Sequence, residues 1–220
     1  MRTIVYVDGY NLYYGMLRGT SNKWLDLVNL FKSYVLNSEA ELVEVRYYTA
    51  PVLGRMCDDA ASPSRQRKYF QALKTLYPSE LTIIEGRISP STPVRRLVTQ
   101  IDGHPLIEKV QVYDFEEKKS DVNIAADLIT GAWTKAYEQA VLCTNDTDLE
   151  GALLAVRKHH PHIKLGLVAP IQNPRYIAKD LKNAVHWSKA LSQIHIQNAQ
   201  LPDRIPNSAI KKPDAWYSQN

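Results

Sequence analysis

Hydrophobic residues recur along the chain in short alternating runs, and segments with helical spacing separate these runs. In "LVEVRYYTA" (42–50), Val43, Val45 and Tyr47 alternate with polar residues, which is typical of a strand with one buried face. Strands are predicted at 2–7, 42–50, 81–88, 140–144, 163–169 and 184–187. Helices are predicted at 10–17, 26–36, 64–77, 121–138, 149–159 and about 174–182, with a loop at 51–63. This order predicts an α/β fold of three layers, with a mainly parallel sheet between helices.

Residues 93–116 interrupt the alternation of strands and helices. "VRRLVTQ" and "IEKVQVYDF" both have extended patterns, and Asp102-Gly103 between them is a common hairpin turn signal. We therefore predict that residues 93–116 form a β-hairpin arm inserted into a single domain at residues 1–190.

The last thirty or so residues differ in composition from the rest. From about residue 202 the chain is rich in proline and polar residues, so residues 191–220 are predicted to be a C-terminal extension. Two readings stay open for its final part. It is either a flexible tail or an extended strap held by Ile205, Ile210 and Trp216.

The composition is that of a globular protein without a membrane segment. The 220 residues are 45% apolar, no apolar run reaches membrane length, and no signal-peptide pattern precedes the first strand. Cys57 and Cys143 do not form a Cys-x-x-Cys pair, and Cys143 lies in an apolar run that predicts a core position. These features predict a cytoplasmic protein of a reducing compartment.

The excess of basic residues is small, but the residues are clustered. The formal net charge is +4 and the pI is about 8.9. Clusters are found in the helix predicted at 64–77 and on the predicted arm, and they comprise Arg65, Arg67, Lys68, Arg95 and Arg96. Such clusters suit a polyanionic partner, and each is equally explained as a solvated face.

Acidic residues follow two predicted strands at the point where each strand ends. Asp8 follows the first strand, and Asp146 and Asp148 follow the strand at 140–144. Asp121 lies in the first turn of the helix that follows the arm. Singly, each Asp is explained as a helix cap. The carboxyl ends of parallel strands meet at one edge of a sheet, so the four carboxylates are expected to converge there and to need a hard cation such as Mg²⁺ or Mn²⁺.

Two other groups of ionisable residues are predicted to lie away from that edge. Asp127 is six residues after Asp121, about 240° around the helix, and is expected to face solvent. The "HHPH" run at 159–162 precedes a strand, which places it at the amino edge of the sheet. Its histidines are better explained by a helix C-terminus than by a metal site.

Three segments together resemble a known family. "VDGYNLYYG", "KKSDVNIAADLI" and "CTNDTDLEGALLAV" are similar, in order and spacing, to the blocks of the NYN domain family of PIN-like ribonucleases, which includes the bacterial DUF88 and LabA-type proteins. The similarity covers roughly residues 3–187. One position departs from the pattern, because Asn145 stands where the family commonly has glycine. Asn tolerates unusual backbone angles, so the turn is expected to survive.

The resemblance implies a PIN-like fold and metal-dependent hydrolysis of RNA phosphodiesters that leaves a 5′-phosphate and a 3′-hydroxyl. It places Asp8, Asp121, Asp146 and Asp148 around Mg²⁺ or Mn²⁺, with Asp8 and Asp146 as direct ligands and the other two as direct or water-mediated ones. Asn11 would hold a ligand or contact a phosphate, and Thr144 and Thr147 would support the ligands or the substrate. The expected partners are single-stranded RNA, bound by the basic clusters, and a second copy of the chain.

Other functions stay open on the sequence. A haloacid-dehalogenase-like phosphatase is disfavoured, because Tyr10 stands where that class has a second Asp. A non-catalytic RNA-binding or scaffold protein and a DNA nuclease are both compatible with the same residues, since contacts to the 2′-hydroxyl leave no pattern in a sequence.

Overall fold

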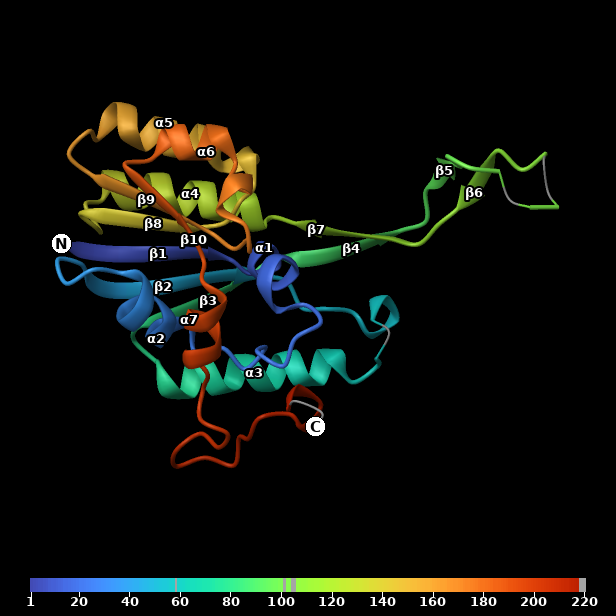
Figure 1. The fold of residues 1–220 in the computed structure, drawn as a ribbon, viewed down its shortest axis with the longest axis horizontal. Coiled ribbons are helices and arrows are strands. Elements are labelled where there is room, and N and C mark those ends of the chain that lie inside the picture. The colour runs from blue at the N-terminus through green and yellow to red at the C-terminus, as the bar shows by residue number, and fades with distance from the viewer. Residues whose placement is uncertain (58, 101, 104–105, 218–220) are drawn as a thin grey trace.

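A six-stranded parallel sheet forms the centre of the computed structural model, which describes residues 1–57, 59–100, 102–103 and 106–217. The strand order is β10-β9-β8-β1-β2-β3, and every neighbouring pair is parallel (Figure 1). The strands are β1 (Arg2–Asp8), β2 (Glu41–Thr49), β3 (Leu81–Glu85), β8 (Gln139–Cys143), β9 (Lys164–Ala169) and β10 (Trp187–Ala190). The predicted parallel sheet is therefore confirmed.

Helices cover both faces of the sheet, which gives three layers (Figure 1). One face carries α4 (Ser120–Trp133), α5 (Glu150–His159) and α6 (Lys179–Ala184). The other face carries α1 (Gly9–Leu12), which continues as a π-helical turn at Tyr13–Leu17, α2 (Leu27–Asn29), which continues as a π-helical segment at Leu30–Val35, α3 (Ser62–Leu76) and α7 (Gln193–Asn198). Short 3₁₀ turns lie at Gly54–Met56, Thr147–Leu149, Pro174–Tyr176 and Asp214–Trp216.

The alternation of β1 supplies two separate cores. Val5 and Val7 pack into the core under α1, α2 and α3, whereas Ile4 and Tyr6 pack into the core under α4, α5 and α6. All four side chains are at most 2% exposed. A strand buried on both faces in this way is what a central position in a parallel sheet requires.

The hairpin arm is longer than the sequence pattern predicts. It consists of two antiparallel pairs, β4 (Arg87–Ser91) with β7 (Asp114–Lys118) and β5 (Val94–Arg96) with β6 (Lys109–Gln111). Figure 1 shows this ribbon projecting from the body. Asp102 and Gly103 form a turn near its tip, and the neighbouring Ile101 and His104 of the predicted turn lie outside the described residues.

Two predicted boundaries of strands are wrong. The strand expected at 81–88 ends at Glu85, because the backbone passes so close to β7 at Gly86 that a Cβ there would lie 2.6 Å from the carbonyl oxygen of Lys118. The strand expected at 184–187 is instead β10, because α6 continues to Ala184. Helix α4 also ends earlier than its predicted boundary at 138, since Lys135 has a φ of 57°.

The end of the chain is a strap, as the second of the two open readings expected. Pro202 accepts a hydrogen bond of 2.9 Å from the indole of Trp24, and Ile205 is 0% exposed. Trp216 packs against Trp24 and Tyr69, with ring centroids 6.0 and 6.1 Å away. The strap thus completes the core on the α3 side of the sheet.

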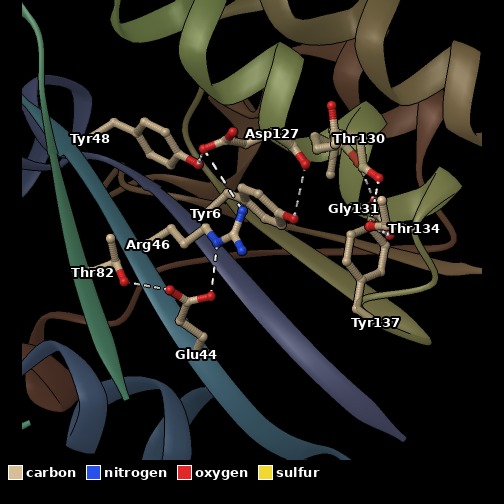
Figure 2. A network of polar contacts seen from close by, with 11 residues as sticks. Tyr6, Glu44, Arg46, Tyr48, Thr82, Asp127, Thr130, Gly131, Thr134 and Tyr137 are labelled. Carbon is tan, nitrogen blue, oxygen red and sulfur yellow. Dashed lines mark hydrogen bonds and ion pairs between the residues drawn. The ribbon is translucent and has the colours of Figure 1, made fainter. Parts of the chain in front are cut away.

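A polar network joins α4 to the strands below it (Figure 2). The Tyr48 hydroxyl donates a hydrogen bond of 2.7 Å to the Asp127 carboxylate, which also lies 3.8 Å from the Arg46 guanidinium. Arg46 in turn donates a hydrogen bond of 2.9 Å to Glu44. Asp127 keeps a 40% exposed side chain, as expected, but its carboxylate is also held by Tyr48, which the sequence did not indicate.

Candidate functional site

The ends of β1 and β8 place Asp8 and Thr144 next to each other. The two strands pair as far as Val7 and Cys143, and Asp8 and Thr144 are the next residue of each chain segment. Asp8 caps α1, accepting a hydrogen bond of 2.9 Å from the Asn11 backbone N–H. Its second carboxylate oxygen accepts a hydrogen bond of 3.0 Å from the Thr144 hydroxyl. At 5% exposure, Asp8 is a buried acid.

The loop after β8 is built around Thr144 and Asn11. The backbone N–H of Asp146 donates to the Thr144 hydroxyl at 3.1 Å, and the N–H of Asp148 donates to the Asp146 carboxylate at 3.0 Å. The Asn11 side chain accepts a hydrogen bond of 2.9 Å from the Asn145 backbone. Asn11 and Thr144 therefore join the loop after β1 to the loop that carries Asp146.

Asn145 has a role that differs from the expected one. Its backbone does not have a positive φ, so the tolerance of Asn for unusual angles is not used. Its side-chain amide donates to the Tyr176 carbonyl at 3.1 Å and accepts from the Ala178 N–H at 2.8 Å. A third loop, the one between β9 and α6, is thereby attached to the site, which a glycine at this position could not do.

Asp121, in the first turn of α4, lies near enough to the acids of the loop after β8 for their charges to affect its pKa. Burial and the neighbouring Asp146 and Asp148 raise the pKa of Asp121 above its usual range. Burial raises the pKa of Asp8 to about 6, and Asp121 and Asp146 add to this rise although hydrogen bonds from Asn11 and Thr144 oppose it. The pKa values of Asp8 and Asp121 are therefore both affected by acids from other segments of the chain.

Glu117 is a fifth acid at this edge, and the sequence did not indicate it. It lies on β7, one residue beyond the expected end of the arm. Burial raises the pKa of Glu117 to about 7, with Asp8 and Asp121 adding to the rise, and the Ser120 hydroxyl donates to its carboxylate. In the sequence, only its position four residues before Asp121 could have indicated it. In the structure, the two residues lie on either side of Lys119, which has a positive φ.

The donor chemistry of this edge suits a hard divalent cation. Its acids destabilise one another's charged forms, and a cation would remove that repulsion. In the part of the chain that the structure describes, however, no three acidic, histidine or cysteine side chains are grouped closely enough to hold a metal ion. Mg²⁺ is usually held by one or two carboxylates and keeps several waters.

Comparison with known proteins identifies the family. The model of the NYN domain matches residues 2–191. The chain belongs to the NYN domain family. Members of this family have a nuclease-like fold, and the match covers both loops that carry Asp8 and Asp146.

Two individual proteins resemble this NYN protein over most of its length. It is 33% identical to 6-hydroxy-3-succinoylpyridine 3-monooxygenase HspA of Pseudomonas putida, in an alignment that spans 100% of this chain and 76% of that protein. A crystal structure of a protein of unknown function from Vibrio parahaemolyticus matches with a TM-score of 0.51 and 16% identity, covering 87% of this chain and 93% of the other. This second similarity supports the PIN-like three-layer fold alone.

The basic residues expected to bind substrate lie at two places in the NYN protein. On α3, the Arg65 guanidinium forms an ion pair of 2.7 Å with Asp59 and is 17% exposed, while Arg67 and Lys68 are exposed. On the arm, Arg95 is paired with Asp114 at 2.9 Å and Arg96 is exposed. No contact among the described residues joins them to the carboxylates, so their role in binding stays a prediction.

The remaining predicted residues have simple positions. Thr147 is exposed in the 3₁₀ turn after Asp146, and its side chain makes none of the hydrogen bonds that join the described loops. His160 follows α5 and precedes β9, so it lies at the amino edge of the sheet as expected. Its ring packs edge-on against Trp133, with centroids 4.4 Å apart.

No helix in the described part of the chain has the length and apolar character needed to span a bilayer.

Proposed function

We propose that this NYN protein hydrolyses phosphodiester bonds in single-stranded RNA, using Mg²⁺ or Mn²⁺ held by Asp8 and Asp146. The observation that carries the proposal is the buried Asp8 carboxylate, whose pKa of about 6 reflects burial and the nearby Asp121 and Asp146. Acids that repel one another at one edge of the sheet do not stabilise the fold, because removing any one of their charges would relieve the repulsion. Such a group of acids is therefore a candidate for function. A cation that neutralises them is the arrangement that phosphoryl-transfer sites employ.

Each residue of the site has a role that follows from its contacts. Thr144 and Asn11 hold the two loops in register, so the Asp8 carboxylate is oriented before any ligand binds. Asp121 and Asp148 extend the negative surface. Glu117, with its pKa of about 7, is half protonated near neutrality and is suited to accept or donate a proton. When bound, the divalent ion would neutralise phosphate oxygens and lower the pKa of a water.

The test compares metal binding and cleavage in the same preparations. Labelled single-stranded RNA and DNA are incubated with Mg²⁺ or Mn²⁺, and metal binding is measured by calorimetry. Asp146→Asn should lose both cleavage and metal binding. Asp180→Asn is the matched control, because Asp180 is an exposed Asp in the first turn of α6. Cleavage of DNA only would indicate a DNA nuclease, and RNA binding without cleavage by the unmodified protein would indicate a binding or scaffold protein.

A second candidate function comes from the relative that is 33% identical over the whole chain. That protein is named as a monooxygenase of 6-hydroxy-3-succinoylpyridine, and we put forward oxygenation of a hydroxylated pyridine as the alternative. The reaction would consume O₂ and a two-electron reductant such as a reduced nicotinamide. Oxygen consumption that depends on 6-hydroxy-3-succinoylpyridine, with product identified by mass spectrometry, would favour this alternative over RNA hydrolysis.

A further inference from the structure

A cavity of about 460 Å³ lies on the α3 side of the sheet, directly beyond Gly9. Its walls come from α1 and the following π-helical turn, the segment around Met56, α3, and the strap at Trp216. Figure 1 shows α1, α3 and the C-terminus on the same side of the sheet. The volume is within the range of small-ligand sites, and π-helical turns are frequent at such sites.

Aromatic rings form much of the wall, and some of them remain exposed. Tyr13 and Tyr14 are 38% and 53% exposed, and their rings meet edge-to-face with centroids 5.3 Å apart. Tyr10 lies beside Tyr14, with centroids 6.1 Å apart. Deeper in the cavity, Tyr69 and Trp216 are mostly buried. Open tyrosine faces next to a hydrophobic floor offer a stacking surface for a planar ring.

Among the described residues that line the cavity, cations outnumber acids. Arg65 is paired with Asp59, which is the only acid among the described residues that line the cavity. Lys23 is half-buried, and burial together with the nearby Arg65 lowers its pKa. No ion pair of Lys23 is found among the described residues, and Arg18 lies 5.4 Å over the Tyr14 ring. A half-buried cation beside a second cation is costly unless an anion joins them.

We propose that this cavity binds a planar aromatic anion, whose ring stacks on Tyr13 or Tyr14 and whose charged group lies between Lys23 and Arg65. A neutral ring would leave Lys23 without a partner, and an anion without a ring would leave the tyrosine faces in water. The shared chemistry is found in aromatic carboxylates and in nucleotides. The proposal rests on the cavity and does not depend on either reaction at Asp8.

Calorimetry with five probes tests whether binding requires both an aromatic ring and a negative charge. It also distinguishes an aromatic carboxylate from a nucleotide as the ligand. Pyridine-3-carboxylate and uridine 5′-monophosphate carry both a ring and a charge. Pyridine-3-carboxamide lacks the charge, benzamide lacks it on a carbocyclic ring, and succinate lacks the ring. The charged aromatic probes should bind about tenfold or more tightly than the other three, the difference expected for one charge-assisted contact. Tighter binding of the carboxylate identifies a free aromatic acid as the ligand, and tighter binding of the nucleotide identifies a nucleotide.

Variants place the binding in the cavity. Lys23→Met and Arg65→Met should each weaken binding of the charged aromatic probes about tenfold, and Tyr13→Leu should weaken it as well. Lys74→Met is the matched control, since Lys74 is an exposed cation on α3 outside the cavity. If a thermal scan shows that Arg65→Met is unfolded through loss of its pair with Asp59, Lys23→Met carries the test.

Three results would overturn the proposal. The first is binding of the carboxamide or of succinate as tight as that of pyridine-3-carboxylate. The second is unchanged affinity in folded Lys23→Met and Tyr13→Leu. The third is the absence of measurable binding by both charged aromatic probes. RNA cleavage by the same preparations is scored separately, so failure here is distinct from failure of the nuclease proposal.

Discussion

The Thr144 hydroxyl donates a hydrogen bond of 3.0 Å to the Asp8 carboxylate and accepts one of 3.1 Å from the Asp146 backbone. One buried side chain, 0% exposed, thus connects the ends of two neighbouring strands. Such a residue orients charged groups, and its loss should affect stability and the site together.

Thr144→Val should therefore destabilise the protein and weaken metal binding. The valine keeps the volume but leaves an oxygen of Asp8 and the N–H of Asp146 without their partner, which costs about 1–3 kcal/mol for each group left buried. Urea unfolding measures the loss. Thr134→Val is the control, because the exposed Thr134 hydroxyl bonds to the carbonyl of Thr130 in its own helix. Equal stability of the two variants would contradict the structural role of Thr144.

Asp146→Asn should abolish RNA cleavage while the metal-free protein stays folded. The Asn side chain can still accept the hydrogen bond from the Asp148 N–H, and one charge is removed from a mutually repelling set. The free energy of unfolding should stay the same or increase by no more than about 0.5 kcal/mol, as for most substitutions at partly exposed sites. Cleavage at the rate of the unmodified protein would remove Asp146 from the site.

The stability of the metal-free protein should fall as the pH rises from about 4 to 7. Asp8 has an ordinary pKa of 3.8 and a folded value of about 6, and Glu117 has 4.5 and about 7. In that window the folded state binds more protons than the unfolded state, so deprotonation favours unfolding. This stabilisation of the folded state is complete at a pH below the ordinary pKa values. It is lost as the pH rises through the pKa values of the folded protein.

Thermal unfolding in EDTA between pH 4 and 8 measures this dependence. Asp8→Asn should make the curve less steep, because one of its two contributors is gone and Glu117 remains. Added Mg²⁺ or Mn²⁺ should raise the unfolding temperature most at the upper end of the range, where the acids are ionised and able to bind it. A curve that rises from pH 4 to 7 would contradict the burial of Asp8 as the dominant effect.

Much of the fold could be predicted from local patterns. The periods of apolar residues located five of the six strands of the sheet, all except β10. Asp26 was correctly expected to begin a helix, since its side chain accepts a hydrogen bond from the Asn29 N–H. The errors arose where a distant segment or a single unusual backbone angle decides the end of an element. The strand break at Gly86 depends on the approach of β7, and the early end of α4 depends on a single left-handed residue, Lys135.

The candidate site was predictable only where acids directly follow strands. Asp8 and Asp146 met that condition, and parallel pairing brought their loops together. Glu117 was missed because it lies on an exposed ribbon whose return to Asp8 is a matter of tertiary structure. Asn145 was expected to matter for its backbone, whereas its side-chain contacts to the loop before α6 could not be read from neighbouring residues.

The arm should contribute to RNA affinity without taking part in the chemistry. Arg95 and Arg96 lie on β5, and Figure 1 shows that this part of the ribbon is remote from the ends of β1 and β8. If both contact phosphates, the double variant Arg95→Glu/Arg96→Glu should release fewer counterions on binding. The slope of log affinity against log salt for single-stranded RNA should then fall by about 0.7 for each lost contact.

The measurement is RNA affinity from low to moderate salt for the unmodified protein and the double variant. The turnover of saturating RNA should fall much less than the affinity, because the carboxylates at Asp8 and Asp146 are unchanged. Lys109→Glu is not a suitable control, since it lies opposite Arg96 on the same ribbon. Lys74→Glu on α3 is suitable, because it reverses an exposed charge on the body. Superimposable affinities and salt slopes for the unmodified protein and the arm variant would exclude the arm from RNA binding and leave Arg67 and Lys68 on α3 as the exposed basic residues to test.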